Sequence, residues 1–485
     1  MSKPTRRSFL EHTLYLAAAG MAVAQKMPTA LADTATGEGP GSASSDEKVR
    51  VAVVGLHSRG LTHVQSFAED PSVEVVALCD VDDAQFGPAQ AKLRTASRPP
   101  AKQYKDLRKI FDDPDIHAVS IATPNHWHAL AGIWGMQAGK DMYVEKPIGH
   151  NITEGRRLEQ ARLKYDRICA AGTQSRSNKA IQAAIQYIHD GKLGDVKLAR
   201  ALCYKTRKSI GHFADSATPA GIDYDIWLGP APVRPFNQNR FIYNWHWNWT
   251  YGNGDIGNQG IHQIDVCRWA LKGQLPTSAL SVGGRYGYED DAQTPNTQLA
   301  FWDLGGPQLT YECRGLTTGA YQTQKIGSLI YGTEGFIAID ANGISVLFDK
   351  EGKMVSKFKG AATNHFSNFA AAVRSRKQSD LHAPILEGHY SAGLSHTGNA
   401  SYRLGTADAL DEVQKKLADN KEMSETFSRF EQHLTQNALD LKSLHCQSGP
   451  ALTFDAQAEN FGTNAAANAM LTREYREPFV VPATL

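Results

Sequence analysis

The clearest pattern in the chain is an apolar run at residues 49–55, VRVAVVG, which is typical of a strand buried in a parallel sheet. A glycine-containing turn follows this run, and residues 61–68 have the apolar spacing of a helix. A second apolar run at 73–79 ends at Asp80. Strand, glycine turn, helix, strand and acid in this order predict the first βαβ unit of a dinucleotide-binding fold.

Each position of the turn has its own physical role. Gly55 permits the tight turn that leaves the strand, and Gly60 lets the helix pack closely on the sheet. The start of the helix, with Ser58 and Arg59, offers free N–H groups and a positive dipole end to a pyrophosphate. Asp80, twenty residues after Gly60, would accept hydrogen bonds from the ribose hydroxyls and repel a 2′-phosphate. We therefore expect NAD as the cofactor, with NADP left open.

His57 departs from this fingerprint, because it stands where the second glycine belongs. A side chain at this position crowds the approach of the pyrophosphate, although we still expect His57 to border the nucleotide. The alternative is a doubly wound fold that binds no dinucleotide.

Two further predicted strands end in polar clusters. Residues 117–123 lead into the sequence Pro-Asn-His-Trp-His, and residues 141–144 lead into Glu-Lys-Pro. Ligands bind at the carboxyl ends of the strands in an open parallel sheet. The residues predicted to contact the nucleotide here are Thr123, Pro124, Asn125, His128, Glu145 and Lys146. In isolation, the Glu145–Lys146 pair would be interpreted as a surface ion pair.

The pattern changes after residue 173. Residues 178–190 have apolar positions at helical spacing, and the sequence Gly-Lys-Leu-Gly ends this helix. Consecutive strands joined by short turns then predict an antiparallel sheet. These strands are expected at 196–204, 280–286, 297–302, 308–313, 326–331, 335–340 and 343–348.

An aromatic segment interrupts this series of strands. Tyr243, Trp245, His246 and Trp247 lie close together, and aromatic faces with polar edges suit the apolar face and hydroxyl rim of a sugar. The alternative is an aromatic-rich core loop. Farther along, His262 and Asp265 share one face of a predicted helix; such a pair is more often structural than catalytic.

Composition narrows the class of protein. Of 485 residues, 41% are hydrophobic and 21% charged, which is ordinary for a globular protein. The formal net charge of +1 gives no case for nucleic-acid binding, and no apolar run reaches the ~20 residues of a membrane-spanning helix. The six cysteines contain no CxxC pair, so we expect free buried thiols, and we expect no metal site.

The N-terminus predicts export. Residues 5–10, TRRSFL, precede a short apolar stretch, and Ala30-Leu31-Ala32 matches a cleavage site. This combination is typical of a twin-arginine signal peptide over residues 1–32, followed by a flexible lead-in over 33–48. The predicted location is periplasmic or secreted.

The motifs TPNHWH at 123–128 and EKP at 145–147, placed after a dinucleotide turn, resemble those of the Gfo/Idh/MocA oxidoreductases. The resemblance continues through 172–177, 223–232, 257–269 and 364–376 to LTREYREPFVVP near the C-terminus. It implies an α/β fold: an N-terminal Rossmann domain at 49–172 and a C-terminal α+β domain at 173–445 with a large, mainly antiparallel sheet. Residues 446–485 are expected to form an extended tail that straps its own or a neighbouring subunit.

The resemblance also implies the catalytic residues. The family's Asp-x-x-x-His pattern maps to Asn258 and His262, so the aspartate is absent here. Asn258 can only orient or polarise the substrate, and His262 becomes the base. Lys146 would hold the alcohol oxygen, and Asp265 would orient His262 or pack the helix. Arg176, in the segment GTQSRS, joins the substrate-binding candidates.

Three functions remain open. The first is an exported oxidoreductase that acts on a sugar or polyol with tightly held NAD. The second is an NAD-dependent glycoside hydrolase or lyase that oxidises C3 transiently without net redox change. The third is a non-catalytic sugar-binding protein that keeps the fold. The expected partners are a small-molecule substrate and further copies of the chain in a homodimer or homotetramer.

Overall fold

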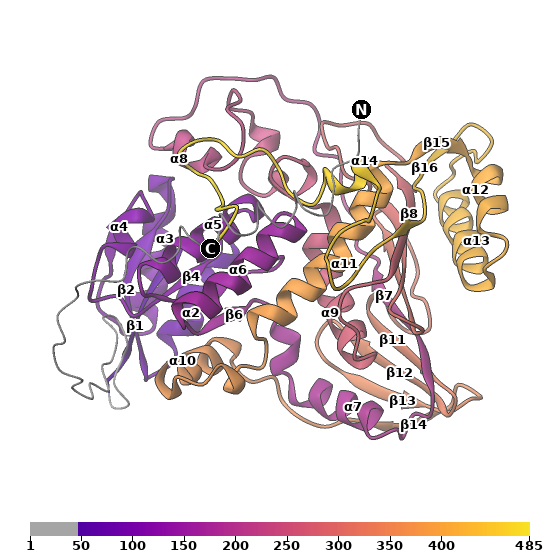
Figure 1. The fold of residues 1–485 in the computed structure, drawn as a ribbon, viewed down its shortest axis with the longest axis horizontal. Helices are drawn as coiled ribbons and strands as arrows, with labels where there is room; N and C mark the ends of the chain where they lie inside the picture. The colour runs from indigo at the N-terminus through magenta and orange to yellow at the C-terminus, as the bar shows by residue number, and fades with distance from the viewer. Residues whose placement is uncertain (1–46) are drawn as a thin grey trace, which may run out of the picture. The chain divides into compact units, whose positions relative to one another are not determined.

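The computed structural model describes residues 47–485, so the predicted signal peptide and nearly all of the lead-in lie outside the described residues. Two sheets organise the described chain (Figure 1). Within residues 47–485, no helix combines the length and apolar character required to cross a membrane.

The first sheet has six parallel strands in the order β3-β2-β1-β4-β5-β6. This is the Rossmann strand order, with the crevice where the order reverses between β1 and β4. Its strands are β1 (Val49–Val54), β2 (Val73–Cys79), β3 (Lys102–Tyr104), β4 (Ala118–Ile121), β5 (Asp141–Val144) and β6 (Cys169–Ala171). Its main helices are α2 (Arg59–Ala68), α3 (Phe86–Thr95), α5 (Asn125–Gln137) and α6 (Ile152–Tyr165).

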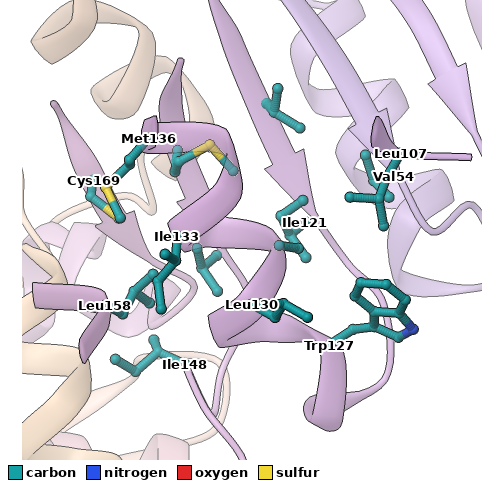
Figure 2. Packing of buried hydrophobic residues seen from close by; sticks show 14 of the residues in the cluster. Val54, Leu107, Ile121, Trp127, Leu130, Ile133, Met136, Ile148, Leu158 and Cys169 are labelled. Atoms are coloured by element: carbon teal, nitrogen blue, oxygen red, sulfur yellow. The ribbon is translucent and has the colours of Figure 1, made fainter. Parts of the chain in front are cut away.

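Apolar side chains from α5 and α6 bury one face of this sheet (Figure 2). Ile133 and Met136 of α5 and Leu158 of α6 are fully buried beside Ile121 of β4. The glycines of α5 allow the close packing: a Cβ atom at Gly132 would lie 2.5 Å from the Leu158 side chain. The nearly continuous apolar sequence of α5 therefore reflects burial on several sides.

The second sheet has eleven strands and is antiparallel except where β7 pairs with β10. The order β14-β13-β12-β11-β7-β10-β9-β8-β16-β15 is completed by β17 on β8. The strands are β7 (Val196–Cys203), β8 (Ser278–Gly284), β9 (Thr297–Asp303), β10 (Gln308–Arg314), β11 (Ile326–Gly332), β12 (Gly335–Asp340), β13 (Ser345–Phe348), β14 (Met354–Lys357), β15 (Thr406–Ala409), β16 (His445–Ser448) and β17 (Leu452–Thr453).

Alternate residues of β9 show how this sheet is covered. Ala300 and Trp302 pack with α7 (Lys179–His189), α9 (Ile261–Ala270) and α11 (Ile385–Arg403), on the face toward the Rossmann domain. Leu299 and Phe301 point to the opposite face, where they pack with α12 (Leu410–Leu417) and α13 (Lys421–Gln436). The period of two along the strand thus gives both faces of this part of the sheet a packed helical layer.

The fold class is confirmed, and every predicted strand of the second half has a counterpart within a few residues. The tail prediction needs correction, because β16 and β17 belong to the second sheet. The final segment does form a strap on its own chain: Phe479 and Val481 are buried in the Rossmann core beside Trp127. Helix α10 (His365–Ser375) also packs on the first sheet, so the second half of the chain supplies part of the first domain's core.

Candidate functional site

The turn after β1 needs both of its glycines. Gly55 has a φ of +83°, and a Cβ atom on it would lie 2.7 Å from the carbonyl oxygen of Ala122. A Cβ atom on Gly60 would lie 1.8 Å from the carbonyl oxygen of Gly55. Ser58 also has a positive φ, of 48°, immediately before α2. The turn thereby brings its backbone close to the sheet and presents the start of α2 to the space above the strands.

A cavity of about 320 Å³ lies at this edge of the sheet, and we call it the nucleotide cavity. Its position, at the carboxyl ends of the parallel strands, is where this fold class binds dinucleotides. The predicted nucleotide-binding residues on its wall are Gly55, His57, Ser58, Arg59, Asp80, Thr123, Pro124, Asn125, His128, Glu145 and Lys146. Gly60 lies beneath the turn, where it allows the close packing of α2.

Asp80 closes the β2 side of this cavity. Its Oδ2 accepts a hydrogen bond of 2.7 Å from the main-chain N–H of Leu56, and its Oδ1 accepts one of 3.0 Å from that of Asp82. Burial raises the pKa of Asp80 to about 6. A carboxylate has four lone-pair sites, so both oxygens can still accept from ribose hydroxyls. The turn, the helix start and this acid together fit NAD.

Glu145 lies on the cavity wall, where the sequence predicts it, and other side chains hold its carboxylate. Its carboxylate is buried and accepts from Arg59 Nε at 2.7 Å, with His63 Nε2 at 3.1 Å from the same oxygen. Gln174 Nε2 donates to that oxygen at 3.0 Å. Although burial alone would raise it, the pKa of Glu145 is held well below its usual range by Arg59 and His63. Glu145 therefore anchors the turn and the base of the cavity, and Arg59 is held toward it.

The segment after β4 is tied to its neighbours. The ring nitrogens of His128 lie 2.6 Å from the carbonyl oxygen of Pro147 and 2.7 Å from that of Thr123. Asn125 Nδ2 donates to Asn253 Oδ1 at 2.8 Å. These contacts join the two strand-end motifs to each other and to the second half of the chain, and fix the cavity wall.

Lys146 reaches across the cavity to the second half of the chain. Its Nζ donates to the main-chain oxygen of Asn258 at 2.9 Å and lies 3.4 Å from Asn258 Oδ1. The amide of Asn258 donates to the Tyr243 hydroxyl at 3.3 Å. Burial lowers the pKa of Lys146 to about 8, in spite of the opposing charge of Glu145.

Asn258 belongs to a π-helical turn, Ile256–Gly260, that runs directly into α9. Such turns occur frequently at functional sites. This one places both Asn258 and His262 on the wall of the nucleotide cavity. Among the described residues the His262 imidazole has no hydrogen-bond partner, and burial together with Lys146 lowers its pKa to about 3. His262 is therefore neutral near pH 7, with a lone pair available to a substrate hydroxyl.

The aromatic segment contributes only part of what the sequence predicts. Tyr243, Trp245 and His246 line the cavity. The Trp245 and His246 rings stack with centroids 3.6 Å apart and an interplanar angle of 19°. Trp247 does not lie on the wall: it is buried, and the Arg207 guanidinium sits 4.9 Å from its ring centroid. The core-loop alternative is therefore correct for Trp247, which follows His246 by one residue but does not line the cavity.

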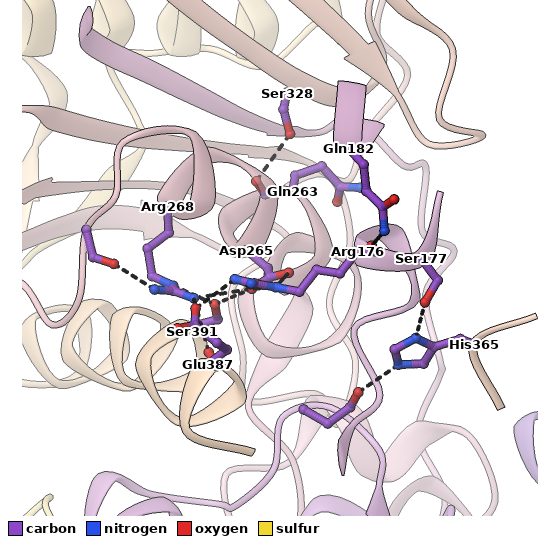
Figure 3. Close-up of polar contacts among 12 residues, drawn as sticks. Arg176, Ser177, Gln182, Gln263, Asp265, Arg268, Ser328, His365, Glu387 and Ser391 are labelled. Atoms are coloured by element: carbon purple, nitrogen blue, oxygen red, sulfur yellow. Dashed lines mark hydrogen bonds and ion pairs between the residues drawn. The ribbon is translucent and has the colours of Figure 1, made fainter. Parts of the chain in front are cut away.

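Arg176 and Asp265 are not among the residues that line the cavity, which corrects two predicted roles. Figure 3 shows that the two side chains point toward each other. Arg176 Nε donates to Asp265 Oδ2 at 2.9 Å, and their side chains are 4% and 0% exposed. Arg268, Glu387 and Ser391 complete this buried cluster. Asp265 packs α9, as the structural alternative held, and makes no hydrogen bond to His262 within the described chain.

Three groups that the sequence did not single out also support the site. Gln174 lies on the cavity wall within the segment that supplied Arg176, and it could have been found there. His63 is buried one helical turn after Arg59. Arg207 bonds both Asp255 and, at 3.1 Å, the Tyr243 hydroxyl; nothing in its local sequence distinguishes it.

Family comparisons agree with this geometry. The model described as "Oxidoreductase family, NAD-binding Rossmann fold" of Gfo/Idh/MocA matches residues 49–173, and the model of the family's "C-terminal alpha/beta domain" matches residues 205–434. The solved WlbA dehydrogenase of Bordetella pertussis, in complex with NADH and UDP-GlcNAcA, shares the fold with a TM-score of 0.53 at 18% identity. That match covers 73% of this chain and 97% of the other.

Curated relatives match shorter segments. Levoglucosan dehydrogenase of Pseudarthrobacter phenanthrenivorans is 37% identical over 37% of this chain and 42% of its own length. The α-N-acetylgalactosaminidase of Shewanella oneidensis is 36% identical over 22% of this chain and 24% of its own. A 1-carboxy-3-chloro-3,4-dihydroxycyclohexa-1,5-diene dehydrogenase of Comamonas testosteroni is 24% identical over 48% of this chain and 50% of its own length. The matches thus span half or less of these relatives' lengths. On the two family models and the site geometry together, the chain belongs to the Gfo/Idh/MocA oxidoreductase family, with an N-terminal NAD-binding Rossmann domain.

Proposed function

We propose that this protein is an NAD-dependent oxidoreductase that oxidises a secondary alcohol of a sugar or polyol. The observation that carries the proposal is the convergence of Lys146, His262 and the dinucleotide turn on one cavity. The sugar-directed relatives support the substrate class, because levoglucosan dehydrogenase shares 37% identity over part of the chain. The stacked Trp245 and His246 rings offer an apolar wall with polar edges for a sugar ring.

Lys146 and His262 act together to remove the hydroxyl proton of the substrate. The Lys146 ammonium donates a hydrogen bond to the alcohol oxygen and so lowers its affinity for the proton. The neutral imidazole of His262 accepts that proton, a role that typically contributes ~10²–10⁴-fold. NAD, when bound, supplies the hydride acceptor for the alcohol carbon.

Asn258 holds the position where the family pattern has an aspartate. Its amide cannot exchange a proton, so it orients Lys146 through the two oxygen atoms that lie near Nζ. The acid–base step is thereby concentrated on His262 alone.

The cellular setting is part of the proposal. The TRRSFL sequence and the ALA cleavage pattern support export by the twin-arginine route, which carries folded proteins. A periplasmic dehydrogenase has no free nucleotide pool, so NAD would stay bound and be recycled by a second substrate. We also propose a homodimer or homotetramer, which light scattering after size-exclusion chromatography tests.

A second candidate is redox-assisted glycoside cleavage, in which C3 is oxidised transiently and reduced again. The relatives named as glycosyl hydrolase family 109 proteins favour it, including one of Shewanella at 29% identity over 31% of this chain. Their similarity covers only about a third of their own length.

One experiment separates the two candidates. The protein is purified without added nucleotide, denatured, and its released cofactor identified by mass. The native protein is then incubated with free sugars and aryl glycosides while absorbance of the reduced nicotinamide is recorded. Retained NAD that a free sugar reduces stably supports the oxidoreductase. Aglycone release without lasting reduction supports glycoside cleavage. If neither signal appears with any compound of the panel, both candidates are contradicted.

A further inference from the structure

A second cavity, of about 270 Å³, lies behind the wall of the nucleotide cavity. Helix α11, the segment 249–253 and the C-terminal segment 469–474 enclose it, and we call it the rear cavity. Within the described chain, the two cavities share no lining residue. They meet at one hydrogen-bonded pair, because Asn253 lines the rear cavity and bonds Asn125 of the nucleotide cavity.

The floor of the rear cavity carries buried polar atoms that lack partners. His150 Nε2, His396 Nε2 and Asn399 Oδ1 are inaccessible and form no hydrogen bond within residues 47–485. His396 and Asn399 are only 8% and 5% exposed. Because these three atoms are covered by protein atoms, they do not face the empty space, and contact with a ligand falls to the polar groups at the rim.

Two arginines provide positive charge at the rim. Arg403 forms no ion pair with any described residue, and its guanidinium lies 5.2 Å from the Trp249 ring centroid. Within residues 47–485, Arg473 donates a single hydrogen bond, of 2.9 Å, to the main-chain oxygen of Thr250. Most donors of both planar groups are therefore free.

The nearby acidic side chains do not accept hydrogen bonds from the guanidinium groups of Arg403 and Arg473 in the described structure. Glu474 is exposed at the rim and forms no ion pair in the described structure. Glu154 interacts with Arg473 through its charge. Its carboxylate accepts hydrogen bonds from the main-chain N–H of His150 and from the side chains of Asn151 and Tyr475, and not from Arg473. The rear cavity thus has two guanidinium groups and one exposed carboxylate, which leaves it with an excess of positive charge.

We propose that the rear cavity binds a small oxyanion, a phosphate or carboxylate group. Guanidinium forks match such groups in geometry as well as charge. This site is independent of the proposed oxidoreductase activity, because none of its residues lies in the nucleotide cavity.

The test measures binding of inorganic phosphate and of acetate to NAD-saturated protein by titration calorimetry, with acetamide as the uncharged control. Saturation with NAD keeps phosphate from the pyrophosphate position of the first cavity. Arg403→Gln removes a rim charge from an exposed side chain without a hydrogen-bond partner in the described chain. Arg94→Gln, on an exposed arginine of α3 that lines neither cavity, is the matched control.

We expect one of the two anions to bind and acetamide not to bind. Arg403→Gln should weaken anion binding by at least ~10-fold, since charged hydrogen bonds contribute strongly, whereas Arg94→Gln should leave it unchanged. The better of the two anions identifies the group that the site prefers. Absence of binding for both anions at millimolar concentration, or binding that Arg403→Gln leaves intact, overturns the proposal.

Discussion

Lys146 donates through Nζ to the main-chain oxygen of Asn258 at 2.9 Å and lies 3.4 Å from that residue's side-chain oxygen. The contact joins a strand-end motif of the Rossmann domain to the π-helical turn of the second domain. Because the facing group is an amide, it adds no negative charge beside the ammonium. The pKa of Lys146 consequently stays near 8, where burial has placed it.

The first prediction follows from this contact. Asn258→Asp places a carboxylate beside Lys146, which favours its charged form and raises its pKa. In the wild type, the protonated Lys146 and the neutral His262 coexist between about pH 3 and pH 8. The rate of alcohol oxidation should therefore fall above pH 8, and Asn258→Asp should move this fall to higher pH by about one unit.

The pH profile of kcat/KM measures this shift. Gln259→Glu adds the same charge one residue along, where Gln259 contacts Lys205 instead, and should move the profile less. If kcat/KM fell at the same pH in the wild type and in Asn258→Asp, the protonation of Lys146 would not control the rate.

The second prediction concerns the base. His262→Asn removes the proton acceptor while keeping a polar side chain, so kcat should fall ~10²–10⁴-fold. Nucleotide binding, measured by fluorescence of the reduced cofactor, should stay the same. His246→Asn alters the aromatic wall instead, and it should raise KM more than it lowers kcat. A His262→Asn variant with wild-type kcat would assign the proton to another group.

The third prediction concerns cofactor choice. Above its pKa of about 6, Asp80 is ionised and repels a 2′-phosphate; below it, the carboxyl group is neutral. The preference for NAD over NADP should therefore weaken as the pH falls from 8 to 5. Asp80→Asn removes the charge at all pH values and should increase the affinity for NADP relative to NAD at pH 8 at least ~10-fold. Dissociation constants for both nucleotides at the two pH values check this, and an unchanged ratio contradicts it.

The sequence predicted what depends on local pattern and strand ends. Alternating apolar runs located the strands, and parallel strands that end at one edge brought Asp80, Thr123 and Lys146 to one cavity. A side chain's direction within a cluster was not predictable in this way. Trp247 differs from its neighbour His246 by one position, yet it is buried and does not line the cavity.

Ion pairs between segments far apart in the sequence could not be predicted either. Arg176 and Asp265 are 89 residues apart, and only the packing of α9 against α11 and the segment after β6 brings them together. Glu145 lies on the cavity wall, as its strand-end motif predicts, but its hydrogen bonds were not predictable. Its partners Arg59 and Gln174 come from other parts of the chain.

The fourth prediction tests the corrected role of Arg176. Arg176→Ala leaves the buried Asp265 without its main partner, which should lower the free energy of unfolding by about 3 kcal/mol. KM for the sugar should not change, since the side chain does not reach the cavity. Denaturant unfolding and steady-state kinetics separate these effects, and Arg94→Ala on the surface should alter neither. A raised KM with unchanged stability would restore the substrate-binding role.

The fifth prediction concerns the six cysteines, all of which are buried free thiols in the described structure. Burial raises the pKa of Cys267 and Cys446 to about 12, so these thiols are protonated and unreactive at neutral pH. Cys203 and Cys313 face each other in register across β7 and β10, and they are the pair that an oxidising compartment would join. A thiol reagent should modify no cysteine of the native protein and all six after denaturation. Four reactive thiols after denaturation without reductant would instead show one disulfide, and mass mapping of the peptides would show whether it joins Cys203 to Cys313.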